Sequence, residues 1–208
     1  KKKFQAFIFD MDGTIIDTAH IWDETNKIFL QKKGIADKKM IDAIIKEVHG
    51  FSATKVATII KKMALLTDSI EEIIIQTKQI ARELLKKEIQ FIDGFLHFHD
   101  RLKNCGVKMA IATNADRDGL WRVNQILQLD NYFFEHMYCI TCVNNVCKPL
   151  PDVYLHAAKQ LGVSPKDCVA IEDSPPGVWA AKNAGMYCIA INTSKLSHGL
   201  GHADLIVD

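Results

Sequence analysis

Apolar and polar residues follow two different patterns along this chain, and the pattern changes near residue 90. Between about residues 18 and 88, apolar residues recur at spacings of three and four, as in "MIDAIIKEV" and "IEEIIIQTKQIARELLKKEI". This period predicts amphipathic helices without strands. From residue 95 onward, short apolar runs alternate with helical stretches. These runs are nearly continuous, which is typical of parallel strands that helices cover on both faces.

The second region predicts a sheet built from repeated strand and helix units. Its predicted strands are "VKMAIAT", "MYCIT", "CVAIE", "CIAIN" and "DLIV", separated by helical stretches such as "DGLWRVNQILQL", "DVYLHAAKQLG" and "PPGVWAAKNAG". The opening run "FQAFIFD" predicts another strand of the same sheet, because a lone strand cannot bury its face. We therefore predict an α/β fold with a doubly wound, mainly parallel, Rossmann-like sheet. Residues 1–16 and 90–208 would form this core, and residues 17–89 an inserted helical domain.

The composition is that of an ordinary globular protein and argues against several partners. Among 208 residues, 26 are basic and 25 acidic, which leaves a net charge of +1 and no basic excess for nucleic acid. No stretch approaches the roughly 18 apolar residues that a membrane span requires. Asp10 and Asp12 interrupt the apolar run behind the Lys-rich start, so we expect no signal peptide. We expect a soluble, cytoplasmic monomer that binds neither nucleic acid nor membranes.

The six cysteines allow two interpretations. Most lie in apolar segments, which favours free core thiols in a reducing compartment over disulfides. His136, Cys139, Cys142 and Cys147 carry the side chains of a zinc site. However, neighbouring positions on a strand point to opposite faces. We therefore prefer core cysteines to a metal site.

Several other polar and aromatic residues have simple structural interpretations. Asp17 is predicted to cap the helix that follows it. His97 and His99 are two residues apart and cannot share a helical face, so we predict that both are exposed. Trp121 and Trp179 have Leu and Val neighbours at helical spacing, which favours core packing.

Polar residues that could carry chemistry follow the predicted strands. In open α/β sheets, ligands bind beyond the carboxyl ends of the strands. The residues expected there, including one from the loop before "PDVYLHAAKQLG", are Asp10, Asp12, Thr113, Asn114, Lys148, Glu172 and Asp173. Phosphoryl transfer needs the charge of the transferred group to be neutralised, and Mg²⁺ prefers hard oxygen ligands. Carboxylates, an ammonium group and neutral donors at one edge therefore favour phosphoryl transfer with a divalent metal.

Four motifs at these positions resemble those of a known family. They are "DMDGT" at 10–14, Thr113 in "IATNA", Lys148 in "CKPLPDVY" and Glu172-Asp173 in "IEDSPPGV". In this order they resemble the haloacid dehalogenase superfamily, in the branch with a helical C1-type cap that includes phosphoglycolate phosphatases and β-phosphoglucomutases. The resemblance covers essentially the whole chain. It implies a Mg²⁺-dependent phosphatase with a cap domain, acting on a small phosphorylated metabolite such as a sugar, polyol or glycolate phosphate.

The resemblance also implies a role for each acidic residue. Asp10 would be the nucleophile that forms an aspartyl-phosphate, and it would also contact the metal. Asp12 would protonate the leaving oxygen and then activate water, while its backbone carbonyl binds Mg²⁺. Asp173 would complete the metal site, with Glu172 as a further ligand or as a group behind the ligands.

The remaining motif residues would bind the phosphate group. Thr113 and Asn114 would hold phosphate oxygens, and Lys148 would offset the charge of the phosphate and the nucleophile. Within the cap, "HGFSATK" at 49–55 is a candidate turn for contact with the substrate. A bare connection between helices is an equally good interpretation of that turn.

Three alternatives to a phosphatase remain at this stage. In a sugar phosphomutase, the stretch aligned with residues 49–53 would carry basic residues, and Val would stand at Thr14. Both departures weaken that alternative. A dehalogenase is disfavoured, because that branch lacks acids equivalent to Asp12 and Asp173. A catalytically silent binding or regulatory module on the same fold is the remaining alternative, although the full set of motif residues is present.

Overall fold

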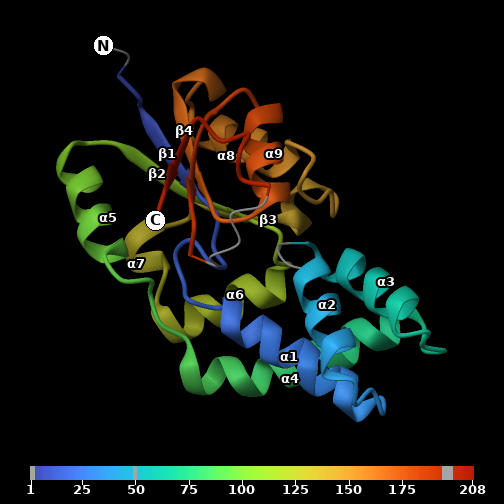
Figure 1. The fold of residues 1–208 in the computed structure, drawn as a ribbon. Helices are drawn as coiled ribbons and strands as arrows, with labels where there is room; N and C mark the ends of the chain where they lie inside the picture. Colours follow the sequence, from blue (N-terminus) through green and yellow to red (C-terminus); the bar gives the residue numbers. More distant parts are fainter. Residues whose placement is uncertain (1–2, 49–50, 194–198) are drawn as a thin grey trace. The chain divides into compact units, whose positions relative to one another are not determined.

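The computed structural model describes residues 3–48, 51–193 and 199–208, and its chain is shown in Figure 1. The chain divides into two compact units. One consists of Lys1–Asp17 together with Gln90–Asp208, and the other consists of Thr18–Ile89. Within the described residues, no helix has the length and apolar character that a membrane crossing needs.

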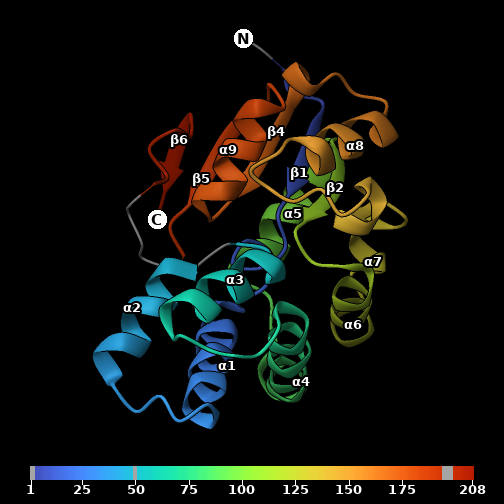
Figure 2. The ribbon, with the colours of Figure 1, turned by 90° about the vertical axis from the view of Figure 1, so that its right-hand side faces the viewer.

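The first unit contains a six-stranded sheet in which every pairing is parallel. Its strands are β1 (Ala6–Phe9), β2 (Lys108–Thr113), β3 (Met137–Cys139), β4 (Cys168–Glu172), β5 (Tyr187–Ile191) and β6 (Leu205–Val207). They lie in the order β3-β2-β1-β4-β5-β6, and the part of this order from β6 to β2 can be followed in Figure 2. The chain thus builds the sheet outward from β1 in both directions, which confirms the predicted doubly wound fold.

Helices cover both faces of this sheet, as Figure 1 shows. The helices of this unit are α5 (Phe95–Asn104), α6 (Arg117–Leu127), α7 (Asp130–Phe133), α8 (Asp152–Leu161) and α9 (Pro175–Asn183), with short 3-10 helices at Ile140–Val143 and Pro165–Asp167. Ala6 and Ile8 of β1 pack in one core cluster with α8 and α9. Phe9 faces the other way, with its ring 5.9 Å from the rings of both Phe95 and Phe133. Successive side chains of β1 point to opposite faces of the sheet, so the strand packs against helices on both sides.

The second unit is a helical bundle, as the spacing of its apolar residues predicts. Its helices are α1 (Ala19–Lys32), α2 (Lys38–Val48), α3 (Ala53–Met63) and α4 (Ile70–Glu88). Its buried core contains Phe29, Leu30, Ile41, Ile44, Val48, Ala57, Ile60, Ala64 and Ile73. Ser69 and Glu72 form a reciprocal capping box at the start of α4, which satisfies two backbone donors that the helix leaves unpaired.

The predictions for Asp17 and His99 are wrong, and each error has a local cause. The N-cap position of α1 is Thr18, whose side chain makes no capping hydrogen bond, and the backbone N–H of Asp17 donates to the carbonyl of Gln90. His97 is exposed, but His99 is 2% exposed. His99 lies four residues after Phe95 and so belongs to the buried face of α5, where a ring nitrogen lies 3.1 Å from the carbonyl oxygen of Tyr132.

The predictions for the tryptophans and for one cysteine also need correction. Trp121 and Trp179 are 55% and 42% exposed, because the adjacent residues Leu120 and Val178 occupy the buried faces of their helices. All six cysteines are free, and Cys105 among them is exposed. The zinc alternative gains no support: within the described chain, the acidic group at the carboxyl edge of the sheet has the geometry of a metal site, and the His136 and cysteine group does not.

Candidate active site

The candidate site lies where the two halves of the sheet diverge. Strands β1 and β4 are neighbours, with Phe9 paired to Ile171. The backbone N–H of Asp10 donates to the carbonyl of Ile171 at 2.9 Å. Asp10 and Glu172 therefore leave adjacent parallel strands at the same edge. Ligands of doubly wound sheets bind at this kind of switch point.

A buried lysine joins these two acids. The ammonium nitrogen of Lys148 lies 2.5 Å from Oδ1 of Asp10 and 2.6 Å from Oε1 of Glu172. The side chains are 2%, 10% and 0% exposed in the same order. Asn114 helps to place the lysine, because its Oδ1 accepts a hydrogen bond from the backbone N–H of Lys148 at 2.8 Å. The peptide bond between Lys148 and Pro149 is cis.

The carboxylate of Glu172 is bonded at both oxygens. Oε1 accepts from Lys148 and also from the hydroxyl of Tyr154, at 2.6 Å. Oε2 is 3.3 Å from the backbone nitrogen of Asp173 and from the hydroxyl of Ser174. Gly177 leaves room for the Glu172 carboxylate, because a Cβ at residue 177 would overlap it. Glu172 thus lies against the first turn of α9, where a negative charge is favoured.

The loop after β1 fits closely around Asp173. Gly13 has a φ of +77°, and a Cβ at this position would overlap the Asp173 carboxylate. The hydroxyl of Thr193, which follows β5, donates to the carbonyl of Gly13 at 2.7 Å. Asp12, between Asp10 and Gly13, is partly exposed. Glycine is therefore required at position 13 both for backbone conformation and for space.

The electrostatic balance of the site is negative. Burial raises the pKa of Asp10 from 3.8 to about 7, although the attraction of Lys148 acts in the opposite direction. Burial, with added repulsion from Asp10 and Glu172, raises the pKa of Asp173 well above its ordinary value. Burial also opposes the charge of Lys148, but the two acids outweigh it and the pKa of Lys148 is raised. One ammonium group therefore compensates only in part for three buried carboxylates.

This arrangement fits a divalent cation. Asp10, Glu172 and Asp173 each offer a carboxylate oxygen, and these oxygens lie within 4.8 Å of one another. Glu172 already accepts hydrogen bonds at both oxygens. Asp10 and Asp173 are consequently the better candidates for direct ligands, with Glu172 behind them. Buried carboxylates of this kind are typical ligands of hard cations.

Neutral donors lie beside the charged group. Thr113 ends β2 and is 1% exposed, and its oxygen accepts from the backbone N–H of Ala115 at 3.0 Å. Its O–H remains available as a donor. Within the described chain, Nδ2 of Asn114 and Oγ1 of Thr14 are buried and have no hydrogen-bond partner. Buried donors without partners are costly, so these atoms are suited to a ligand that brings acceptor oxygens.

The structure brings together most of the residues that the sequence indicates. Asp10, Lys148, Glu172 and Asp173 form one buried group, to which Asn114 is hydrogen-bonded. Thr113 and Asp12 adjoin this group in the chain. Part of the candidate cap turn, residues 49–50, lies outside the described residues. Tyr154, Ser174 and Gly177 also contact or make room for Glu172 and are not among the predicted site residues. The Ser-Pro-Pro-Gly turn after β4 is a sequence signal for Ser174 and Gly177.

Comparison with known proteins identifies the family of the chain. A model of the family described as haloacid dehalogenase-like hydrolase matches residues 7–191. The chain belongs to the haloacid dehalogenase-like hydrolase family. Among relatives in this family, the phosphorylated carbohydrates phosphatase of Thermotoga maritima is 29% identical, over 88% of this chain and 82% of its own length. The β-phosphoglucomutase of Bacillus subtilis is 28% identical, over 98% of this chain and 88% of its own.

Solved structures of the family share the fold. The β-phosphoglucomutase of Clostridium difficile superposes with a TM-score of 0.81 and 22% identity, covering 99% of this chain and 91% of that one. At this identity the similarity is evidence for the fold alone. The six-stranded parallel sheet with flanking helices is thus the core of a haloacid dehalogenase-like hydrolase.

Proposed function

We propose that this haloacid dehalogenase-like hydrolase is a Mg²⁺-dependent phosphatase of small phosphomonoesters, such as sugar, polyol or glycolate phosphates. The observation that carries the proposal is the position of Lys148 between Asp10 and Glu172, with Asp173 beside them at the carboxyl ends of β1 and β4. A phosphatase among the relatives named above supports the reaction class. A monomer in the cytoplasm remains our expectation.

In this proposal, Asp10 is the nucleophile. One of its carboxylate oxygens forms a bond to phosphorus as the bond from phosphorus to the ester oxygen breaks, which leaves an aspartyl-phosphate. Asp12 gives its proton to the leaving oxygen, so that an alcohol departs. Asp12 then takes a proton from water, and the water oxygen bonds to phosphorus as the bond from phosphorus to the Asp10 oxygen breaks. This step releases inorganic phosphate and restores the Asp10 carboxylate and the protonated Asp12. Asp12 is partly exposed, whereas Asp10 and Asp173 are buried, so water can reach Asp12 from the solvent.

The surrounding residues neutralise and orient the phosphate. Lys148 holds positive charge beside Asp10, which favours the ionised form of the nucleophile and offsets the charge that reaches the transferred group. Thr113 and Asn114 donate to the phosphate oxygens through the O–H and N–H groups described above. Asp10, Asp173 and the backbone carbonyl of Asp12 would hold Mg²⁺, which would supply further positive charge beside the transferred phosphate.

A phosphate-release screen tests this function. The purified chain is incubated with Mg²⁺ and a panel of sugar, polyol, glycolate and nucleotide monophosphates, with and without EDTA. We expect release from at least one small phosphomonoester, dependence on Mg²⁺, and a loss of at least about a thousandfold in Asp10→Asn. Asp167→Asn is the matched control, because Asp167 precedes the opposite end of β4. It should retain normal activity.

Three results would contradict the proposal. Full activity of Asp10→Asn would exclude Asp10 as the nucleophile. No hydrolysis across the panel would favour a silent binding module. Interconversion of sugar phosphates that depends on glucose 1,6-bisphosphate, without net phosphate release, would instead identify a phosphomutase.

A further inference from the structure

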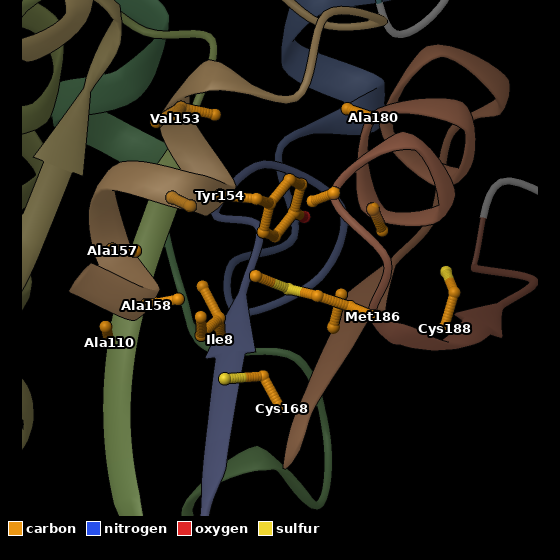
Figure 3. Close-up of a cluster of buried hydrophobic side chains, with 14 of the residues drawn as sticks. Ile8, Ala110, Val153, Tyr154, Ala157, Ala158, Cys168, Ala180, Met186 and Cys188 are labelled. Carbon is orange, nitrogen blue, oxygen red and sulfur yellow. The ribbon is translucent and has the colours of Figure 1, made fainter. Parts of the chain in front are cut away.

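Tyr154 is a core residue whose hydroxyl belongs to the active site. It lies in α8 and is 0% exposed, and its ring packs among the apolar side chains of the core cluster. Figure 3 shows the ring between α8 and α9. The hydroxyl donates to Oε1 of Glu172 at 2.6 Å. Burial and the neighbouring acids raise the pKa of Tyr154 well above its ordinary value, so the oxygen keeps the proton that it donates.

The same tyrosine also contacts the lysine. Its hydroxyl oxygen lies 3.5 Å from the ammonium nitrogen of Lys148, and this nitrogen is 4.9 Å from the centre of the Tyr154 ring. A cation at this distance from an aromatic ring is attracted to it. Lys148 has four rotatable side-chain bonds and would otherwise adopt many conformations. Asp10, Glu172 and Tyr154 surround its ammonium group instead.

We propose that Tyr154 is a positioning residue, which fixes the Glu172 carboxylate and thereby holds the Lys148 ammonium group against Asp10. This inference rests on the phosphatase function proposed above. Oε2 of Glu172 is placed by Ser174 and by the backbone of Asp173. Oε1 depends on Lys148 and Tyr154 alone among the hydrogen bonds of the described residues. Without the tyrosine hydroxyl, Oε1 would keep Lys148 as its hydrogen-bond partner, and this end of the carboxylate could shift together with the ammonium group away from the nucleophile.

The test compares two variants that each remove one buried oxygen. Tyr154→Phe keeps the ring and removes the hydroxyl. Tyr138→Phe is the matched control, because Tyr138 belongs to the same core cluster but places its hydroxyl 3.0 Å from a ring nitrogen of His136, outside the site. We expect kcat of Tyr154→Phe to fall by about ten- to a hundredfold with KM changed less than about twofold. Tyr138→Phe should keep both constants within about twofold.

Thermal unfolding separates positioning from simple packing. Both variants should lose small amounts of stability, because each removes one hydrogen bond of a tyrosine hydroxyl. The inference fails if kcat of Tyr154→Phe equals that of Tyr138→Phe while both melt at similar temperatures. It also fails if the loss in Tyr154→Phe lies entirely in KM, since Tyr154 would then act on substrate binding.

A second measurement does not depend on activity. A buried, hydrogen-bonded ammonium group gives a slowly exchanging ¹⁵N–¹H signal in NMR spectra, and its absence in Lys148→Arg assigns it. We expect this signal to shift or broaden in Tyr154→Phe and to stay unchanged in Tyr138→Phe. An unchanged signal in Tyr154→Phe would refute the positioning role. If the wild-type protein hydrolysed no phosphomonoester, the proposed function would fail, and the NMR result would still decide whether Tyr154 positions Lys148.

Discussion

Replacing Asp10 with Asn tests whether the buried, ionised Asp10 lowers the free energy of unfolding of the protein. Asp10 is buried, and burial raises its pKa from 3.8 to about 7. An unfolded chain releases this proton near its ordinary pKa. Between the two values, the native state therefore binds more protons than the unfolded state, and its stability falls as the pH rises. Above about pH 7, Asp10 is ionised in both states, so the loss of stability has reached its full size and no longer changes with pH.

The size of the effect follows from the same pKa. A tenfold change in proton affinity corresponds to about 1.4 kcal/mol, so the ionised Asp10 costs the native state at most about 4 kcal/mol near pH 8. Asn has nearly the same shape and no charge, and it avoids this cost. The pKa of about 7 already includes the attraction and the hydrogen bond of Lys148, so no further loss is subtracted for them. We expect Asp10→Asn to be more stable than the wild type by up to about 4 kcal/mol near pH 8.

Urea unfolding in EDTA between about pH 4 and pH 8 measures this difference. The advantage of Asp10→Asn should shrink as the pH falls and vanish near pH 4, where Asp10 is protonated in the native wild type. Added Mg²⁺ should narrow the gap near pH 8, because a cation that binds the ionised acids stabilises the wild type more. Asp167→Asn, which removes a carboxylate next to the opposite end of β4, is measured beside it as the control. A difference that is constant with pH, or a less stable Asp10→Asn near pH 8, would refute the reasoning.

Other substitutions give further tests. Gly13→Ala places a methyl group against the Asp173 carboxylate at a φ of +77°, so we expect a loss of about 2 kcal/mol and of most phosphatase activity, measured by unfolding and phosphate release. Asp204 accepts from Lys182 and the backbone of Cys188, and despite partial burial these bonds lower its pKa. Asp204→Asn should therefore cost about 1–2 kcal/mol at neutral pH, and the difference should disappear as acid protonates Asp204 below about pH 4. Ser69→Ala removes the cap of α4 and should cost about 1 kcal/mol, without effect on KM.

Much of the fold could be predicted because strands that are covered on both faces are apolar throughout. "CVAIE" is buried at every position and forms β4 over all its residues. "MYCIT" was a harder case. It is a strand only over Met137–Cys139 and continues as a 3-10 helix, in which Thr141 accepts from the backbone N–H of Arg117. Such contacts with distant residues are not visible in a local apolar pattern.

The predicted burial of single residues failed where it depended on how a helix is rotated. His99 and Phe95 are four residues apart and face the core together, although His99 alone looks like a surface residue. Trp121 follows the buried Leu120 directly, so it is turned about 100° away from the core despite its apolar character. Periodicity shows that a helix has a buried face, and neighbouring elements decide which residues complete it.

The site could be predicted more securely than these residues because it depends on topology. In a parallel sheet, all strands deliver their next residue to the same edge, so Asp10 and Glu172 meet once β1 and β4 are neighbours. The position of Tyr154 beside the site does not follow from the topology of the sheet. Its place beside the buried Val153, Ala157 and Ala158 predicts a core ring, and phenylalanine would pack there as well. Only the buried hydroxyl requires a partner, and the partner that the fold supplies is the carboxylate that holds Lys148.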